Sequence, residues 1–195
     1  MENSQDMLAA YALIGNIDKL STVVCFGIAA SAAVIVGKEI GAGTDHKKVY
    51  EISWTLLLVS LMIGAGVMLL LLGLLPVFFQ PVLFPLFKLS SGATLAATSM
   101  AIVYAVFMPM RAFDTTNLTG VLRAGGDARI ASVIDITPLW LVAIPLMAVT
   151  ALVLNAPVPL VCIAMQAENL CKCPLGLIRF HSRKWIHDIT PVSYT

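Results

Sequence analysis

The sequence predicts an all-α membrane protein with five transmembrane helices. Hydrophobic residues make up 59% of the chain, charged residues only 12%, and the mean hydropathy is +0.92. Soluble domains have roughly 45–50% apolar and about 25% charged residues. Apolar runs long enough to cross roughly 30 Å of hydrocarbon recur along the chain, and we place the five spans at 8–36, 53–75, 93–119, 130–154 and 158–178.

The first span, 8–36, is rich in Gly, Ala and Ser, which permit close contact between membrane helices. It is interrupted by the polar residues Asn16, Asp18 and Lys19. Residues next to each other in sequence do not face each other on a helix, so Asp18 and Lys19 cannot neutralise one another along one face. We therefore expect Asp18, Lys19 or both to meet another helix or a water-filled cavity.

The second span, 53–75, carries no charge, and its Gly64-Ala65-Gly66 stretch favours close helix packing. The segment 78–87 that follows is apolar. However, it contains Pro81 and Pro85 and begins two residues after Pro76. Because proline removes a backbone donor and disrupts regular helices, we predict an interfacial loop here.

The third span, 93–119, contains Pro109, which can kink it. Arg111 and Asp114 are three residues apart and share a helix face, so one interpretation is a structural ion pair. The other is that Asp114, together with Asn117 and Thr115, contributes to a cation or proton site. An ionisable side chain within a membrane is costly and usually faces a cavity.

The fourth span, 130–154, contains Asp135 at a depth comparable to that of Arg111 and Asp114, so the three could form one polar cluster. Alternatively, Asp135 helps to cap or orient its own helix. In the fifth span, 158–178, Glu168 and Lys172 are four residues apart, in the order that favours a helical ion pair. We interpret them as a structural pair.

The loops predict an orientation. One side has only Lys88, and the opposite side has the basic residues Lys38, Lys47, Lys48, Arg123, Arg129, Arg179, Arg183 and Lys184. Positively charged loops stay in the cytoplasm. We therefore predict a multi-pass protein of the plasma membrane with its N-terminus outside and its C-terminus in the cytoplasm. Because the first span then starts outside, we expect an upstream span to be missing.

Several function classes are disfavoured. The net charge is +1 and the basic residues are scattered over short loops, so we expect no nucleic-acid partner. The three histidines lack metal-binding spacing, and no phosphate loop or hydrolase motif occurs. We thus expect no enzyme, no metal site and no cofactor. The four cysteines suggest buried thiols rather than a disulfide framework.

Four motifs occur in order along the chain: GIAASAAVIVGKEIGAG with VYE, FDTTNLTGVLRAGGD, DITPLWLVAIPL and RFHSRKWIHDIT. Together they resemble the C-terminal part of a multidrug and toxic compound extrusion (MATE) family transporter. Members of that family have twelve spans in two six-helix lobes. The resemblance implies that the five spans correspond to the eighth through twelfth, so that the first helix of the C-terminal lobe and the entire N-terminal lobe are missing.

The resemblance also implies the activity: efflux of small organic, often cationic, compounds coupled to inward Na⁺ or H⁺ by alternating access. The implied partners are the lipid bilayer, the organic substrate and the missing N-terminal lobe. Some family members place an acidic residue of a cation site in the tenth span, where this chain has Asp114.

Two alternatives remain open. One is a flippase for lipid-linked or polysaccharide precursors, built on a related plan. Several basic residues lining the central cavity between the two lobes would favour a flippase, and Lys19 and Arg111 are the candidates in this chain. The other is a membrane accessory protein that transports nothing.

Overall fold

The computed structural model describes residues 2–154 and 156–187, and these residues form helices without any strand. The α-helices are α1 (Glu2–Gly41), α2 (His46–Leu74), α3 (Phe84–Leu86), α4 (Ser91–Thr115), α5 (Ala128–Pro138), α6 (Ile144–Ala148) and α7 (Val158–His181). Four π-helical segments extend them, at Leu75–Leu83, Thr116–Leu122, Leu139–Ala143 and Val149–Val153. The predicted all-α fold is confirmed.

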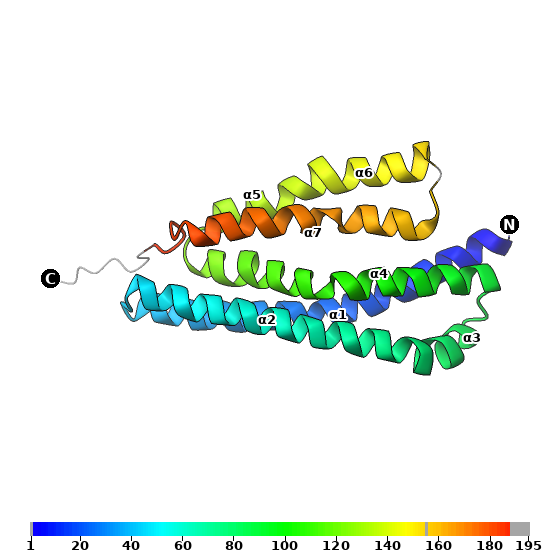
Figure 1. Cartoon of the computed structure of the whole chain (residues 1–195), viewed down its shortest axis with the longest axis horizontal. Coiled ribbons are helices and arrows are strands. Elements are labelled where there is room, and N and C mark those ends of the chain that lie inside the picture. Colours follow the sequence, from blue (N-terminus) through cyan, green and yellow to red (C-terminus); the bar gives the residue numbers. More distant parts are fainter. Residues whose placement is uncertain (1, 155, 188–195) are drawn as a thin grey trace.

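The helices form long rods that run side by side along the molecule (Figure 1). Helix α4 lies in the middle and contacts α1, α2 and α7, while α5 and α6 pack against α7 on the outer side. The α1–α2 turn, the loop between Leu122 and Ala128 and the end of α7 all lie at the same end of the bundle. An odd number of passes therefore separates the start of α1 from the end of α7.

Four rods are long and apolar enough to cross a membrane: Asp6–Gly41, His46–Leu86, Ser91–Leu122 and Ala128–Val153. The fifth predicted span, 158–178, forms a helix of similar length, α7, but does not reach the same apolar character. Its polar residues Gln166, Glu168, Asn169 and Lys172 account for the difference. Since α7 lies between α4 and α5, it can cross beside the other rods with these side chains turned toward its neighbours.

The interfacial loop predicted at 78–87 is wrong, because the helix continues through it. After Leu74 the chain forms the π-helical segment Leu75–Leu83 and then α3, so that the second span runs to Leu86 rather than to residue 75. Pro81 lies inside the π-helical segment. The wider π-helical turn bonds five residues back, and so it accommodates prolines that would break a regular α-helix.

Glycines set the closest approaches between the rods. A Cβ atom added to Gly64 of α2 would lie 2.8 Å from Pro109 Cα and 2.8 Å from Ala112 Cβ of α4. The expected close packing at Gly64 is therefore present. A Cβ atom on Gly120 would likewise lie 2.8 Å from the carbonyl oxygen of Ala29 in α1. These contacts hold the Ser91–Leu122 rod tightly against both α1 and α2, and this rod carries Arg111 and Asp114.

The residues after α7 fold back onto the end of the bundle. Trp185 is fully buried, donates its Nε1–H to the carbonyl oxygen of Phe180 at 2.9 Å, and stacks on the Phe180 ring. The Phe180 ring stacks in turn on Tyr50 of α2. The His187 amide donates to the carbonyl oxygen of Gly125 at 3.0 Å. The last part of the terminal motif, 188–190, lies outside the described residues.

Candidate functional site

Polar side chains line two cavities between the rods. The large cavity, of about 460 Å³, is bounded by α1, α4, α7 and the Leu139–Met147 stretch. Its polar lining consists of Tyr11, Asn16, Asp18, Lys19, Tyr104, Arg111, Gln166 and Glu168. The small cavity, of about 300 Å³, is lined by Asp114, Thr115, Thr119, Arg123, Asp135, Asn169 and Lys172, together with Phe26 and Leu118.

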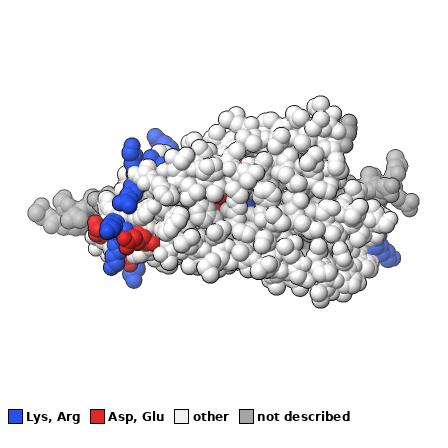
Figure 2. All heavy atoms as spheres, in the orientation of Figure 1, with Lys and Arg blue, Asp and Glu red and all other residues white. Residues whose placement is uncertain are grey.

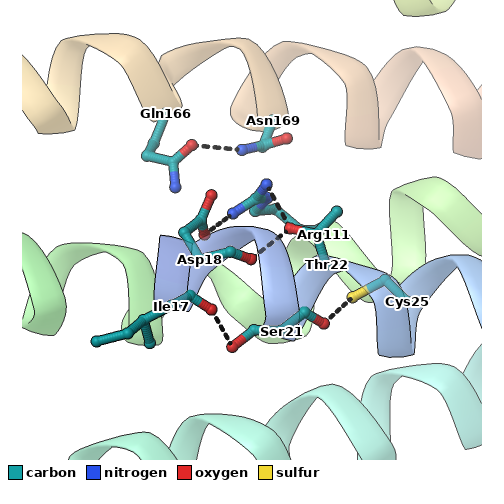
Figure 3. A network of polar contacts seen from close by, with 8 residues as sticks. All are labelled: Ile17, Asp18, Ser21, Thr22, Cys25, Arg111, Gln166 and Asn169. Atoms are coloured by element: carbon teal, nitrogen blue, oxygen red, sulfur yellow. Dashed lines mark hydrogen bonds and ion pairs between the residues drawn. The ribbon is translucent and has the colours of Figure 1, made fainter. Parts of the chain in front are cut away.

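An ion pair between α1 and α4 lies in the large cavity. The Arg111 guanidinium pairs with the Asp18 carboxylate, and its second terminal nitrogen donates to Thr22 Oγ1 at 3.0 Å. Figure 3 shows the arginine reaching from α4 to both α1 side chains, with Gln166 and Asn169 of α7 on the opposite side. The side chains of Arg111 and Asp18 are only 21% and 19% exposed.

Arg111 therefore does not form the pair with Asp114 that the sequence suggested. The two residues lie one turn apart on α4 but line different cavities. Helix α1 presents both a carboxylate and a hydroxyl group to the guanidinium, whose several donors can bind both. Asp18 thus meets another helix, whereas its neighbour Lys19, like Asn16, lines the large cavity.

Asp135 belongs to a chain of charges around Lys172. The Lys172 ammonium lies 3.0 Å from Asp135 and 3.4 Å from Glu168, and Arg123 lies 3.7 Å from Asp135. The pair proposed between Glu168 and Lys172 is thus present and extends from α7 to α5. The residue at the start of α5 is Asp127, which pairs with Arg179, so Asp135 does not cap its helix.

Asp114 differs from the other acidic residues of the two cavities. Only 4% of it is exposed, and its Oδ2 atom has no hydrogen-bond partner among the described residues. Asn117, one turn later, is fully buried and both of its amide atoms lack such a partner, as does the Thr116 hydroxyl. Lys172 lines the same cavity but is bound by Asp135 and Glu168.

The helix changes form at this point, because α4 becomes π-helical at Thr116. Single π-helical turns within α-helices occur frequently at functional sites. A buried carboxylate oxygen without a partner is energetically expensive, so Asp114 is the acidic residue of this cavity that most needs an explanation. Asp114 and Asp135 share this cavity, as the sequence suggested, but Arg111 does not join them.

Several residues of the site were not predicted, and Gln166 and Asn169 are the ones that interact with each other. Asn169 donates to Gln166 at 3.3 Å, and both side chains are buried. Gln166 lines the large cavity and Asn169 the small one, so this pair on α7 lies between the two. Their spacing of three residues in a mostly apolar helix was the signal available in the sequence. The four cysteines are free thiols, and Cys25 and Cys162 are buried.

Long apolar rods that enclose polar cavities define an α-helical membrane protein. The model of the MatE family matches residues 1–149. The chain therefore belongs to the MatE family, which confirms the resemblance seen in the sequence, and it is a multi-pass membrane protein of the efflux-transporter type. Searches of curated proteins and of solved structures gave no match.

Proposed function

We propose that this chain forms one lobe of a cation-coupled exporter of small organic compounds, and that Asp114 binds the coupling cation, Na⁺ or H⁺. The observation that carries the proposal is the buried Asp114 carboxylate, with an unpartnered oxygen on the wall of a cavity and the unpartnered Asn117 amide one turn away. A cation would neutralise the carboxylate, and a carboxylate and an amide both offer oxygen ligands to it.

The lining of the large cavity favours a small organic substrate over a lipid-linked precursor. Its basic residues Lys19 and Arg111 are matched by the acidic residues Asp18 and Glu168, so it lacks the positive surplus that a flippase for phosphate-linked precursors would need. Tyr11, Tyr104, Met147 and Met165 add the aromatic and adaptable apolar surface that suits varied organic cations.

The charge distribution supports the proposed orientation in the plasma membrane. Lys and Arg side chains gather with Asp and Glu at one end of the molecule, where α7 ends (Figure 2). Much less charge lies at the opposite end. Under the positive-inside rule, the end of α7 is cytoplasmic and the start of α1 is outside.

Asp114→Asn tests the cation site. We expect the purified wild-type chain either to bind ²²Na⁺ at equilibrium or to show the infrared carbonyl band of a protonated carboxyl group. In either case, we expect the variant to lose at least about 90% of that signal, because the amide keeps the shape but carries no charge. Asp135→Asn is the matched control, since Asp135 lines the same cavity but is paired with Lys172.

Two results would overturn this assignment. One is a wild-type chain that shows neither ²²Na⁺ binding nor a protonated carboxyl group. The other is a signal that Asp114→Asn leaves intact. A signal lost only in Asp135→Asn would instead move the site to the charge network around Lys172.

A further inference from the structure

A third cavity shares no lining residue with the two cavities described above. It is an apolar groove of about 460 Å³ between α2, α4 and α7. Its walls include Leu58, Leu61, Val106, Met110 and Leu177, and Trp54 lies among them. Leu58, Leu61 and Val106 are each about 40–50% exposed. An empty groove between membrane-spanning helices would lose dispersion contacts, so apolar material must fill it.

Basic side chains gather beyond the Trp54 end of the groove. The His181 ring lies 5.6 Å from the Trp54 ring. Tyr50 lies one turn before Trp54 on α2, and the Arg183 guanidinium sits 4.5 Å from the centre of its ring. Lys47 lies two turns before Trp54, on the same face of α2 by helical geometry.

These basic side chains lie where a membrane surface would be. Lys47, His181 and Arg183 are exposed and lie at the start of α2 and around the end of α7. Charged side chains concentrate at this end of the bundle (Figure 2). Between His46 and Trp54 of α2 the acidic residue is Glu51, and its negative charge is smaller than the combined positive charge of Lys47 and Arg183. Tryptophan is enriched at membrane interfaces, and Trp54 marks the change from the apolar groove to the charged end.

We propose that this groove binds one acyl chain of an anionic phospholipid, whose phosphate lies against Lys47, His181 and Arg183. The long apolar walls match the acyl chain, and the basic side chains match the phosphate. A docked helix would require small residues that allow close backbone approach. The groove walls instead carry bulky Leu, Val, Met and Trp side chains, which favour a flexible acyl chain.

Native mass spectrometry of the full chain in mild detergent tests the proposal. Phosphatidylglycerol and phosphatidylcholine with identical acyl chains are titrated separately. We expect one phosphatidylglycerol to be retained at least about fivefold more strongly, and Lys47→Gln with Arg183→Gln to abolish the preference, since each basic residue near a membrane surface contributes about fivefold. Both substituted residues are exposed, so the fold should survive.

Substitutions within α2 test the groove itself. Leu61→Trp should fill it and lower phosphatidylglycerol retention at least about fivefold. Leu69→Trp makes the same change at an exposed position of the same helix outside the groove, and it should retain the lipid. Equal retention by the two Trp variants, or equal retention of the two lipids by the wild type, overturns the proposal. If Leu61→Trp instead leaves lipid retention unchanged and weakens only the binding of a second protein chain, the groove is a protein interface and the proposal is also overturned.

Discussion

Replacing Arg111 by Met is expected to destabilise the chain by roughly 3 kcal/mol. The guanidinium pairs with Asp18 and donates to Thr22 between α1 and α4, and both charged side chains are largely buried. Removing one member of such a pair leaves the other charge buried without a partner, which costs about 3–5 kcal/mol. The expected loss is near the lower end of that range because each side chain retains about a fifth of its exposure.

Thermal unfolding of the purified chain in detergent measures this effect. The double variant Arg111→Met with Asp18→Asn should recover more than half of the lost stability, because it no longer buries an unpaired carboxylate. Arg129→Met changes an exposed arginine at the start of α5 and should behave like the wild type. If the double variant were less stable than Arg111→Met alone, the coupling between Arg111 and Asp18 would be refuted.

Replacing Trp185 by Ala is expected to destabilise the chain by about 3–5 kcal/mol, as is typical of large buried aromatics. The indole is fully buried, stacks on Phe180 and donates to its carbonyl oxygen. A Cβ atom on Gly125 would lie only 2.3 Å from the indole ring, so the loop before α5 also packs directly on it. The substitution would leave a cavity where α2, α7 and this loop meet.

Two further variants separate the contributions of Trp185. Trp185→Phe keeps a stacked ring but loses the hydrogen bond, and we expect a loss of about 1 kcal/mol beyond the change in volume. Trp140→Ala removes an indole that is 64% exposed and should change the melting temperature little in detergent. Equal melting temperatures for Trp185→Ala and Trp140→Ala would show that the fold at this end does not depend on Trp185.

The fold could be predicted largely because membranes restrict the choice of structure to long apolar helices. The same reasoning failed at 78–87, where the prolines signalled a loop and the chain instead forms π-helical turns. Proline content shows that a regular α-helix is disfavoured, but it does not show which alternative the chain adopts. The close contact at Gly64 could be predicted because small residues in a charge-free helix have few other roles.

The candidate site could be predicted only in part. Asp114 was identified because an acidic residue within a membrane span is energetically costly and usually has a function. The partner of Arg111 was not identified. Helical spacing predicts contacts between residues of the same helix, and Asp18 lies on another helix, far away in sequence. Gln166 and Asn169 were missed because neutral polar residues disturb hydropathy less than charges do. Their role depends on α7 lying between two cavities, which only the tertiary structure reveals.

The proposal that this chain is one lobe of an exporter is tested most directly by ion flux in proteoliposomes. The purified 195-residue chain is reconstituted alone, and Na⁺ and H⁺ movements are followed with and without an organic cation such as ethidium. A single lobe can bind the coupling cation, but alternating access requires a second lobe across the central cavity. The chain alone should therefore show no ethidium-stimulated flux of either ion. Robust ethidium-stimulated flux from a monomeric preparation would contradict the account.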